Sequence, residues 1–245
     1  MSVRRIGTWK DSLRRGRDAA IACLLPGGLP IAPILALVDG YLFPHEGVFL
    51  YWLARSGPGS GCVVEIGSFR GRSTLCMAAG ASAGRKTRVF AVDPHVYQTA
   101  QELGENLRHF GLEAFVDAVV LPSVEVARQW SEPVRLLFVD GNHGKESVEA
   151  DVKTWLPHLQ PGGFLLLHDS TSLSGFPGPI EVAKTTLRPG PIFDAVGELG
   201  SITWGRRSGA TAPWLPPAYG KAFLDATLRA LQSLRGAGSN PGRAS

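Results

Sequence analysis

Runs of apolar residues alternate with stretches of helical periodicity along most of the chain. Five runs of mostly apolar residues predict strands that are buried on both faces, at 62–66, 88–92, 118–121, 135–139 and 164–167. Helices are expected between and around these strands, at 47–55, 72–79, 97–110, 148–159 and 180–187. Two further runs, 193–199 and 201–205, meet at Gly200 and predict a hairpin at the edge of the sheet.

The helix expected at 148–159 has the clearest pattern. Apolar residues recur there at the spacing of one helix face, and they are Val148, Val152, Trp155, Leu156 and Leu159. The alternation of buried strands with such helices is typical of a parallel sheet that is covered on both sides. We therefore expect an α/β fold with a doubly wound, mostly parallel sheet of seven strands.

The chain is expected to have three parts. Residues 1–40 predict an N-terminal helical cap, acting as a lid or a dimer arm, and residues 41–207 the ligand-binding catalytic domain. Residues 208–245 predict a Pro/Gly-rich extension with one helix near 218–234. The apolar run 21–38 has about the length of a membrane span, but three prolines and a Gly-Gly pair interrupt it. Short packed helices are favoured there over a membrane span, membrane contact or a secretory signal.

Composition and charge narrow the function classes. A hydrophobic share of 44% with 19% charged residues suits a folded domain with a sizeable core. The three cysteines form no Cys-x-x-Cys, so we expect no disulfide framework or thiolate zinc site, and a reducing, cytoplasmic location fits. The net charge of +4 comes from the two ends, because residues 21–200 carry −5. A central region with this negative net charge does not favour nucleic-acid binding, although the basic ends could meet an acidic partner or an anionic membrane.

Polar residues gather where the predicted strands end. In a parallel sheet these carboxyl ends lie at one edge, where ligands bind at the point at which strand order reverses. The residues at these positions are Glu65, Asp93, His95, Asp140, His143, His168 and Asp169. Three of the six histidines of the chain are among them, which predicts a chemical site at this edge.

The loop after the first strand has the spacing Gly-x-x-x-Gly, from Gly67 to Gly71. It lacks the third glycine of a dinucleotide-binding loop, where the pyrophosphate would rest on the helix N-terminus. A ligand that carries a positive sulfonium would instead benefit from the acid at Glu65. Asp93, at the end of the second strand, can accept hydrogen bonds from both hydroxyls of a ribose. A tight structural turn at 67–71 and a helix-capping or turn role for Asp93 are the alternatives.

Four segments resemble one known family. They are Val-Val-Glu-Ile-Gly-Ser-Phe-Arg-Gly-Arg-Ser-Thr (63–74), Ala-Val-Asp-Pro-His (91–95), Val-Asp-Gly-Asn-His (139–143) and Pro-Gly-Gly-Phe-Leu-Leu-Leu-His-Asp (161–169). Together they are similar to the class I S-adenosylmethionine-dependent methyltransferases. The similarity is greatest to the bacterial branch of macrolide sugar O-methyltransferases and cephalosporin-hydroxylase-type proteins. The resemblance covers about 45–207 and implies a Rossmann-like methyltransferase fold.

The resemblance also implies roles for single residues. Glu65, Gly67 and Ser68 would lie near the methionine end of the cofactor, Asp93 at its ribose and Ser123 near its adenine. The full set of cofactor-binding residues expected from these loops is Glu65, Gly67, Ser68, Gly71, Ser73, Asp93, Pro94, His95, Ser123 and Asp140. His143 resembles a general base that acts beside Asp140, and these two are the expected catalytic residues.

A divalent cation, Mg²⁺ or Mn²⁺, is the second cofactor that the resemblance implies. In metal-using members, acids after the fourth and fifth strands hold the ion, and the matching residues here are Asp140, His168 and Asp169. His168 stands where such relatives often have a carboxylate. Because Mg²⁺ prefers oxygen ligands, an imidazole there either weakens the case for a metal or shifts the preference toward manganese, iron or zinc.

The expected reaction is methyl transfer to a hydroxyl of a small molecule or glycoside, with His143 taking the proton. Apolar and aromatic segments favour a partly hydrophobic acceptor of natural-product type. A homodimer or larger oligomer is expected. The alternatives are a nicotinamide-dependent oxidoreductase, a non-catalytic cofactor-binding or assembly module, and a nucleic-acid methyltransferase that would use the basic ends.

Overall fold

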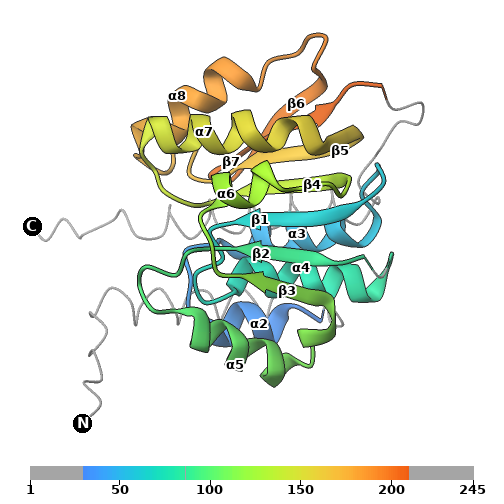
Figure 1. Cartoon of the computed structure of the whole chain (residues 1–245), viewed down its shortest axis with the longest axis vertical. Helices are drawn as coiled ribbons and strands as arrows, with labels where there is room; N and C mark the ends of the chain where they lie inside the picture. The colour runs from blue at the N-terminus through green and yellow to red at the C-terminus, as the bar shows by residue number, and fades with distance from the viewer. Residues whose placement is uncertain (1–29, 86, 210–245) are drawn as a thin grey trace, which may run out of the picture. The chain divides into compact units, whose positions relative to one another are not determined.

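The computed structural model describes residues 30–85 and 87–209 (Figure 1). The cap expected at 1–40 is therefore described only from residue 30 onward. The helix expected near 218–234, and nearly all of the C-terminal extension, lie outside the described residues. No helix in the described part of the chain has the length and apolar character needed to cross a membrane.

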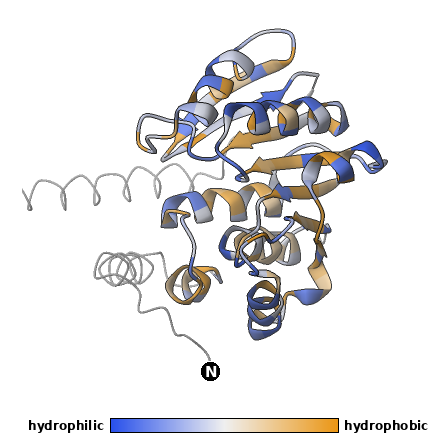
Figure 2. Ribbon diagram, turned by 60° about the vertical axis from the view of Figure 1, so that its left-hand side comes forward, coloured by the Kyte–Doolittle hydropathy of each residue, from blue (hydrophilic) through white to orange (hydrophobic). Residues whose placement is uncertain are grey.

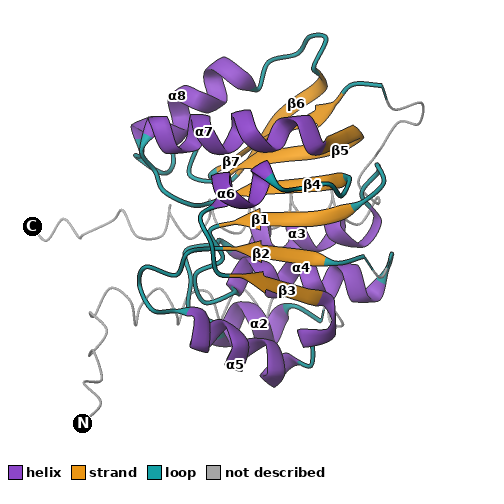
Figure 3. Cartoon of the chain, viewed as in Figure 1, coloured by secondary structure: helices purple, strands orange, loops and turns teal. Residues whose placement is uncertain are grey.

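A seven-stranded sheet forms the centre of the domain. Its strands are β1 (Cys62–Ile66), β2 (Val89–Val92), β3 (Val116–Val119), β4 (Val134–Val139), β5 (Leu159–Leu167), β6 (Phe193–Leu199) and β7 (Ile202–Arg207). They lie in the order β3-β2-β1-β4-β5-β7-β6, and β7 alone runs in the direction opposite to the other strands. The predicted doubly wound, mostly parallel seven-stranded sheet is confirmed (Figure 3).

Helices cover both faces of this sheet (Figures 1 and 3). They are α2 (Ala32–Leu37), α3 (Pro44–Ser56), α4 (Arg72–Ala83), α5 (Ala100–Phe110), α6 (Ser123–Arg128), α7 (Lys145–Trp155) and α8 (Pro177–Thr186). Two 3₁₀ turns, Glu113–Phe115 and Leu156–His158, precede β3 and β5. The arrangement places every β-to-α loop of the parallel strands at one edge of the sheet.

The core on one face joins the sheet to α6, α7 and α8. Val148, Val152 and Trp155 of α7 are buried against strand residues such as Leu137 and Leu165. This is the face that the helical periodicity predicts. On the other side of the sheet, α3 packs on α4, and α2 also contacts α4. Figure 2 shows the strands coloured mainly as hydrophobic, whereas hydrophobic and hydrophilic residues alternate along the helices.

Several element boundaries differ from the expectation, and two of these differences have a clear cause. The third strand ends at Val119 rather than 121, and α6 follows at once, because Pro122 precedes a helix that the sequence pattern did not predict. The helix expected at 148–159 ends at Trp155, since Pro157 lacks a backbone N–H and the chain continues as a 3₁₀ turn. The predicted hairpin at Gly200 is confirmed at the edge of the sheet, with β6 outermost and β7 between β5 and β6.

Candidate active site

A cavity of about 1110 Å³ opens among the loops that follow the carboxyl ends of β1 to β5. The segment 39–43 between α2 and α3 also lines it. The cavity lies at the point where strand order reverses between β1 and β4, as expected. The predicted site residues that line it are Gly67, Ser68, Ser73, Asp93, Pro94, Ser123, Asp140, His143 and Asp169. Four others lie behind the lining, and they are Glu65, Gly71, His95 and His168.

The loop after β1 is pressed against the loop after β4. Gly67 has φ +87°, and a Cβ there would overlap the carbonyl oxygen of Asp140. Only glycine combines this backbone conformation with so close an approach. The next residue, Ser68, is 2% exposed, and its hydroxyl has no hydrogen-bond partner although it lines the cavity. A buried hydroxyl without a partner is available to a ligand that enters here.

Glu65 lies beneath this loop rather than in the cavity. It is fully buried, and its two carboxyl oxygens accept hydrogen bonds from the hydroxyls of Ser73 and Thr74 on α4. The pKa of Glu65 is raised from 4.5 to about 8, mainly by burial. The two hydrogen bonds lower it, and the charges of Asp140 and Asp93 add to the rise. Glu65 thus ties β1 to the start of α4 and supports the loop from below.

Asp93 fixes two loops at once. Its Oδ2 accepts a hydrogen bond from the backbone N–H of Phe69 (2.8 Å), and its Oδ1 accepts one from that of His95 (2.6 Å). A carboxylate has further lone pairs on both oxygens, so it can still accept from a ligand. The ring of His95 turns away from the cavity and contacts the hydroxyl of Thr99 through Nδ1 (2.9 Å).

Backbone strain gathers in these loops. Among the described residues, four that are not glycine have positive φ, and they are Phe69, His95, Gln98 and Asp169. All four lie in the loops after β1, β2 and β5. Such conformations cost about 1–3 kcal/mol each and persist where surrounding contacts hold them, which is common at functional sites.

A hydrogen-bonded pair from α6 and α7 lines the cavity, and only one of its two members was predicted from the sequence. Ser123, expected near an adenine, donates its hydroxyl hydrogen to Asp151 of α7. Both residues line the cavity, and burial raises the pKa of Asp151. Asp151 was missed, although an acid stands there on the buried face of a helix between Val148 and Trp155.

Arg72 places a cation against the same cavity. It is 6% exposed, and its Nη1 donates a hydrogen bond to the carbonyl oxygen of Val38 (2.8 Å). Its neighbour Arg70 instead forms ion pairs with Asp39 and Glu102 and does not line the cavity. The sequence alone could not distinguish the two arginines, because they flank Gly71 symmetrically.

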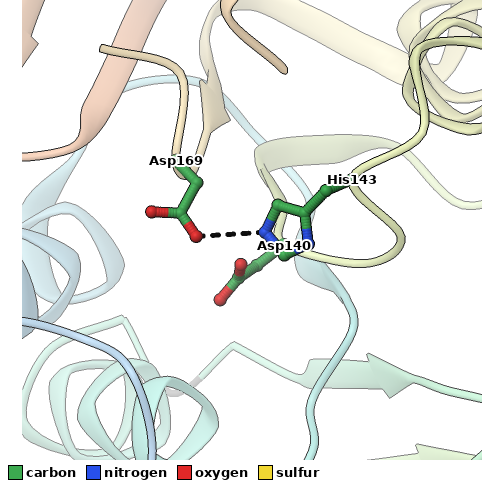
Figure 4. A group of neighbouring side chains, drawn as sticks. All are labelled: Asp140, His143 and Asp169. Carbon is green, nitrogen blue, oxygen red and sulfur yellow. Dashed lines mark hydrogen bonds and ion pairs between the residues drawn. The ribbon is translucent and has the colours of Figure 1, made fainter. Parts of the chain in front are cut away.

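Asp140, His143 and Asp169 converge from the loops after β4 and β5 (Figure 4). His143 Nε2 lies 3.0 Å from Asp169 Oδ2, and its ring stacks on Phe176 with centroids 4.1 Å apart. Burial alone would raise the pKa of Asp169, but His143 and His168 hold it well below its usual range. One potential ligand atom from each of the three residues lies within 4.8 Å of the others.

His168 lies behind this group and is not accessible from the cavity. Its side chain is 1% exposed, with Nδ1 at 3.0 Å from Asp140 Oδ1 and Nε2 at 3.3 Å from Glu46 Oε2. Burial alone would lower its pKa, but the nearby carboxylates of Asp140, Asp169 and Glu46 raise it well above the usual value. Glu46, on α3, was not identified from the sequence, because nothing in the pattern of that helix relates it to β5.

Residues 64–170 match the protein family described as "Methyltransferase domain". The matched stretch begins in β1 and ends just beyond Asp169, so it contains the four sequence segments noted above except Val63, the first residue of the first segment. This stretch is therefore similar to a methyltransferase domain, and the fold of the chain is that of the class I S-adenosylmethionine-dependent methyltransferases.

Solved structures with the same fold include several O-methyltransferases. CalS11, a TDP-rhamnose 3'-O-methyltransferase of calicheamicin biosynthesis, is 17% identical, with a TM-score of 0.56 over 82% of this chain and 95% of that one. TomG of Streptomyces achromogenes, solved with S-adenosylmethionine, is 15% identical, with a TM-score of 0.59 over 82% and 100%. An O-methyltransferase of Bacillus cereus, solved with S-adenosylhomocysteine, is 18% identical, with a TM-score of 0.59 over 78% and 97%. At these identities the similarity establishes the fold.

One curated relative is the uncharacterized protein y4gI of Sinorhizobium fredii (strain NBRC 101917 / NGR234). The two sequences are 30% identical over 156 residues. The match covers 59% of this chain but only 17% of the relative. This relative is therefore related in sequence but indicates no activity for the chain.

Proposed function

We propose that the protein transfers the methyl group of S-adenosylmethionine to a hydroxyl of a small molecule or glycoside. The observation that carries this proposal is the His143–Asp169 pair on the wall of a cavity that Asp93 also lines. A base at one position and a ribose acceptor at another are what O-methylation requires of this fold. The O-methyltransferases among the structures with this fold support the same class of reaction.

The cofactor would lie across the loops in strand order. Asp93, after β2, would accept hydrogen bonds from the ribose, and Ser123 with Asp151, beyond β3, would meet the adenine. Gly67 and Ser68 would contact the methionine part, and the guanidinium of Arg72 would attract its carboxylate. The sulfonium would then face Asp140, beyond β4.

In this mechanism His143 is the general base. If Nε2–H donates to Asp169, as in other Asp–His pairs, Nδ1 is left to accept the proton of the acceptor hydroxyl. When bound, S-adenosylmethionine would supply the methyl group: the hydroxyl oxygen would bond to the methyl carbon as the carbon–sulfur bond breaks, and the electrons of that bond would remain on sulfur. Asp169 stabilises the imidazolium that forms, and the proton leaves His143 for solvent after the transfer.

The acceptor would meet an apolar rim. Leu173 and Phe176, in the segment after β5, are exposed, and both line the cavity, as does the exposed Tyr41. Exposed apolar side chains around a pocket favour a ligand with apolar surface. This supports a partly hydrophobic acceptor, such as a glycosylated natural product.

A divalent cation fits the expected ligand set poorly. Both ring nitrogens of His168 lie beside carboxylates, which favours a ring that carries both protons, and such a ring has no lone pair for a metal. Asp140, which would bind the same ion, is already in contact with that ring. No step of the proposed mechanism is therefore routed through a metal.

The test is an assay of S-adenosylhomocysteine release with a panel of hydroxylated acceptors, with cofactor binding measured separately. For His143→Ala we expect turnover to fall about 10²- to 10⁴-fold with cofactor affinity retained, because only the base is lost. His109→Ala is the matched control, since His109 is exposed on α5 and does not line the cavity. Full turnover in both His143→Ala and Asp140→Asn would refute these roles.

Two rival functions give different results in the same assays. A nicotinamide-dependent oxidoreductase would bind NADH in a fluorescence titration, and a non-catalytic module would bind S-adenosylmethionine but release no product with any acceptor. Cytoplasmic location and assembly into a homodimer or larger oligomer stay predictions from the sequence. Light scattering of the purified chain would measure the oligomeric state.

A further inference from the structure

A buried chain of charged groups runs from α3 to the cavity. Glu46 of α3 is fully buried, and its Oε2 lies 3.3 Å from Nε2 of His168. On the other side of the ring, Nδ1 lies 3.0 Å from Asp140 Oδ1 and 3.5 Å from Asp169 Oδ2. One imidazole is thus enclosed by three carboxylates, two of which line the cavity.

The groups around this ring favour its charged form. The hydroxyl of Ser201 donates its hydrogen to Glu46 Oε1 (2.8 Å), so it presents a lone pair to His168 Nε2 at 3.1 Å. Nε2 therefore faces only acceptors, and Nδ1 lies beside the carboxylates of Asp140 and Asp169, although it forms no well-aligned hydrogen bond with either. A neutral imidazole would leave one ring lone pair facing a carboxylate in the buried interior, which is strongly unfavourable.

The network is held from three elements. The backbone N–H of Ser201, between β6 and β7, donates a second hydrogen bond to Glu46 Oε1 (2.7 Å). Glu46 Oε2 also accepts from the backbone N–H of Phe43 at the start of α3 (2.7 Å). The backbone N–H of His168 is bonded to the carbonyl oxygen of Val139 on β4 (3.0 Å). Such a connected arrangement is expected to keep its geometry when ligands enter the cavity.

We propose that His168 is a built-in cation that holds Asp140 and Asp169 in place. Its charged ring takes over the role that a divalent metal ion would otherwise have at these carboxylates. Glu46 is the positioning residue that keeps the ring charged and oriented. Methyl transfer by this chain is then independent of metal. The part of this inference that concerns metal binding does not rest on the proposed function, whereas metal-independent turnover does.

The charge of His168 has a direct consequence for cation binding. A fixed positive charge in contact with Asp140 repels a divalent ion at the same carboxylate, and burial keeps water from screening that repulsion. Replacing His168 by asparagine removes the charge and retains a hydrogen-bond donor of similar size. The variant is therefore expected to bind divalent ions where the wild type does not.

The experiment is a titration of the full chain with Mn²⁺, followed by electron paramagnetic resonance. We expect no saturable site dependent on Asp140 in the wild type, and Mn²⁺ affinity higher by about tenfold or more in His168→Asn. His109→Asn is the matched control and should behave as the wild type. Tight Mn²⁺ binding by the wild type that Asp140→Asn removes would overturn the inference, and so would equal affinities in the wild type and His168→Asn.

A second measurement needs no variant at the histidine. Nitrogen-15 spectra of the wild type at neutral pH should show both ring nitrogens of His168 protonated, and the same ring should become neutral or mobile in Glu46→Gln. A neutral ring in the wild type would contradict the proposal even if His168→Asn failed to fold.

Turnover of the wild type should be unchanged by a chelator. Loss of turnover that Mn²⁺ restores would overturn metal independence, while absence of turnover throughout would count against the proposed function alone.

Discussion

The acidic side chains around the cavity differ in what they hold. Asp93 accepts two backbone hydrogen bonds and still faces the cavity, whereas Glu65 is used entirely inside the protein. Asp169 is paired with His143 at its open side and with His168 behind. These differences could not be predicted from strand-end positions, because a residue number fixes the end of a strand but not the direction of a side chain.

Glu65 gives a prediction about pH. Its pKa rises from 4.5 to about 8 on folding, so the folded state retains a proton that the unfolded chain releases between these values. The stabilisation by the neutral carboxyl is complete below about pH 4.5 and is lost as the pH rises to about 8. We expect the free energy of unfolding of the wild type to fall over this range relative to Glu65→Gln, measured by urea denaturation. A difference between the two proteins that does not change with pH would contradict this.

Gly67→Ala tests the close approach of the β1 and β4 loops. Both the φ of +87° and the overlap with the carbonyl oxygen of Asp140 oppose a Cβ, so we expect a loss of about 3 kcal/mol of stability and loss of cofactor binding. Gly175→Ala is matched in φ, at +81°, but has open space around it. It should cost only about 1 kcal/mol. If Gly67→Ala and Gly175→Ala lose equal stability in thermal unfolding and equal cofactor affinity in calorimetry, the contact with Asp140 does not matter.

At the scale of elements, the apolar runs located every strand of the sheet. Strands β1, β2 and β4 began within one residue of the prediction, because they are buried on both faces and end at sharp polar boundaries. β5 begins five residues earlier than expected, at Leu159, since a register shift against β4 admits Pro161 and the glycines after it. The short helix α6 was missed because six residues carry too little periodicity.

The β6–β7 hairpin matters to the site through Glu46, and Gly200→Ala tests this. A Cβ at Gly200, where φ is +62°, would overlap Glu46 Oε1 and His45 Nε2. We expect this variant to displace Ser201 from Glu46 and to reduce turnover as well as stability. Gly111→Ala, with φ +64° and open space, should lower stability by about 1 kcal/mol and leave turnover unchanged. If both variants keep full turnover, the hairpin is not coupled to the site.

At the scale of the whole molecule, the order of the strands brings the residues together. Segments as far apart in sequence as Glu46, Asp140 and Ser201 meet because β1, β4, β5 and β7 lie side by side. The sequence motifs predicted which loops form the cavity, since each follows a recognisable strand. They could not predict Glu46, Asp151 or Arg72, whose roles depend on the packing of helices onto the sheet.

The most direct test of the account is calorimetric titration of the full chain with S-adenosylhomocysteine. We predict one saturable site in the wild type and binding weaker by about 10- to 100-fold in Asp93→Ala, because a charged hydrogen-bond acceptor of the ribose is removed. Asp117→Ala, an exposed site on β3 paired with Arg88, should bind as the wild type does. Absence of binding by the wild type, or unchanged binding by Asp93→Ala, would contradict the central claim that this cavity holds the methyl donor.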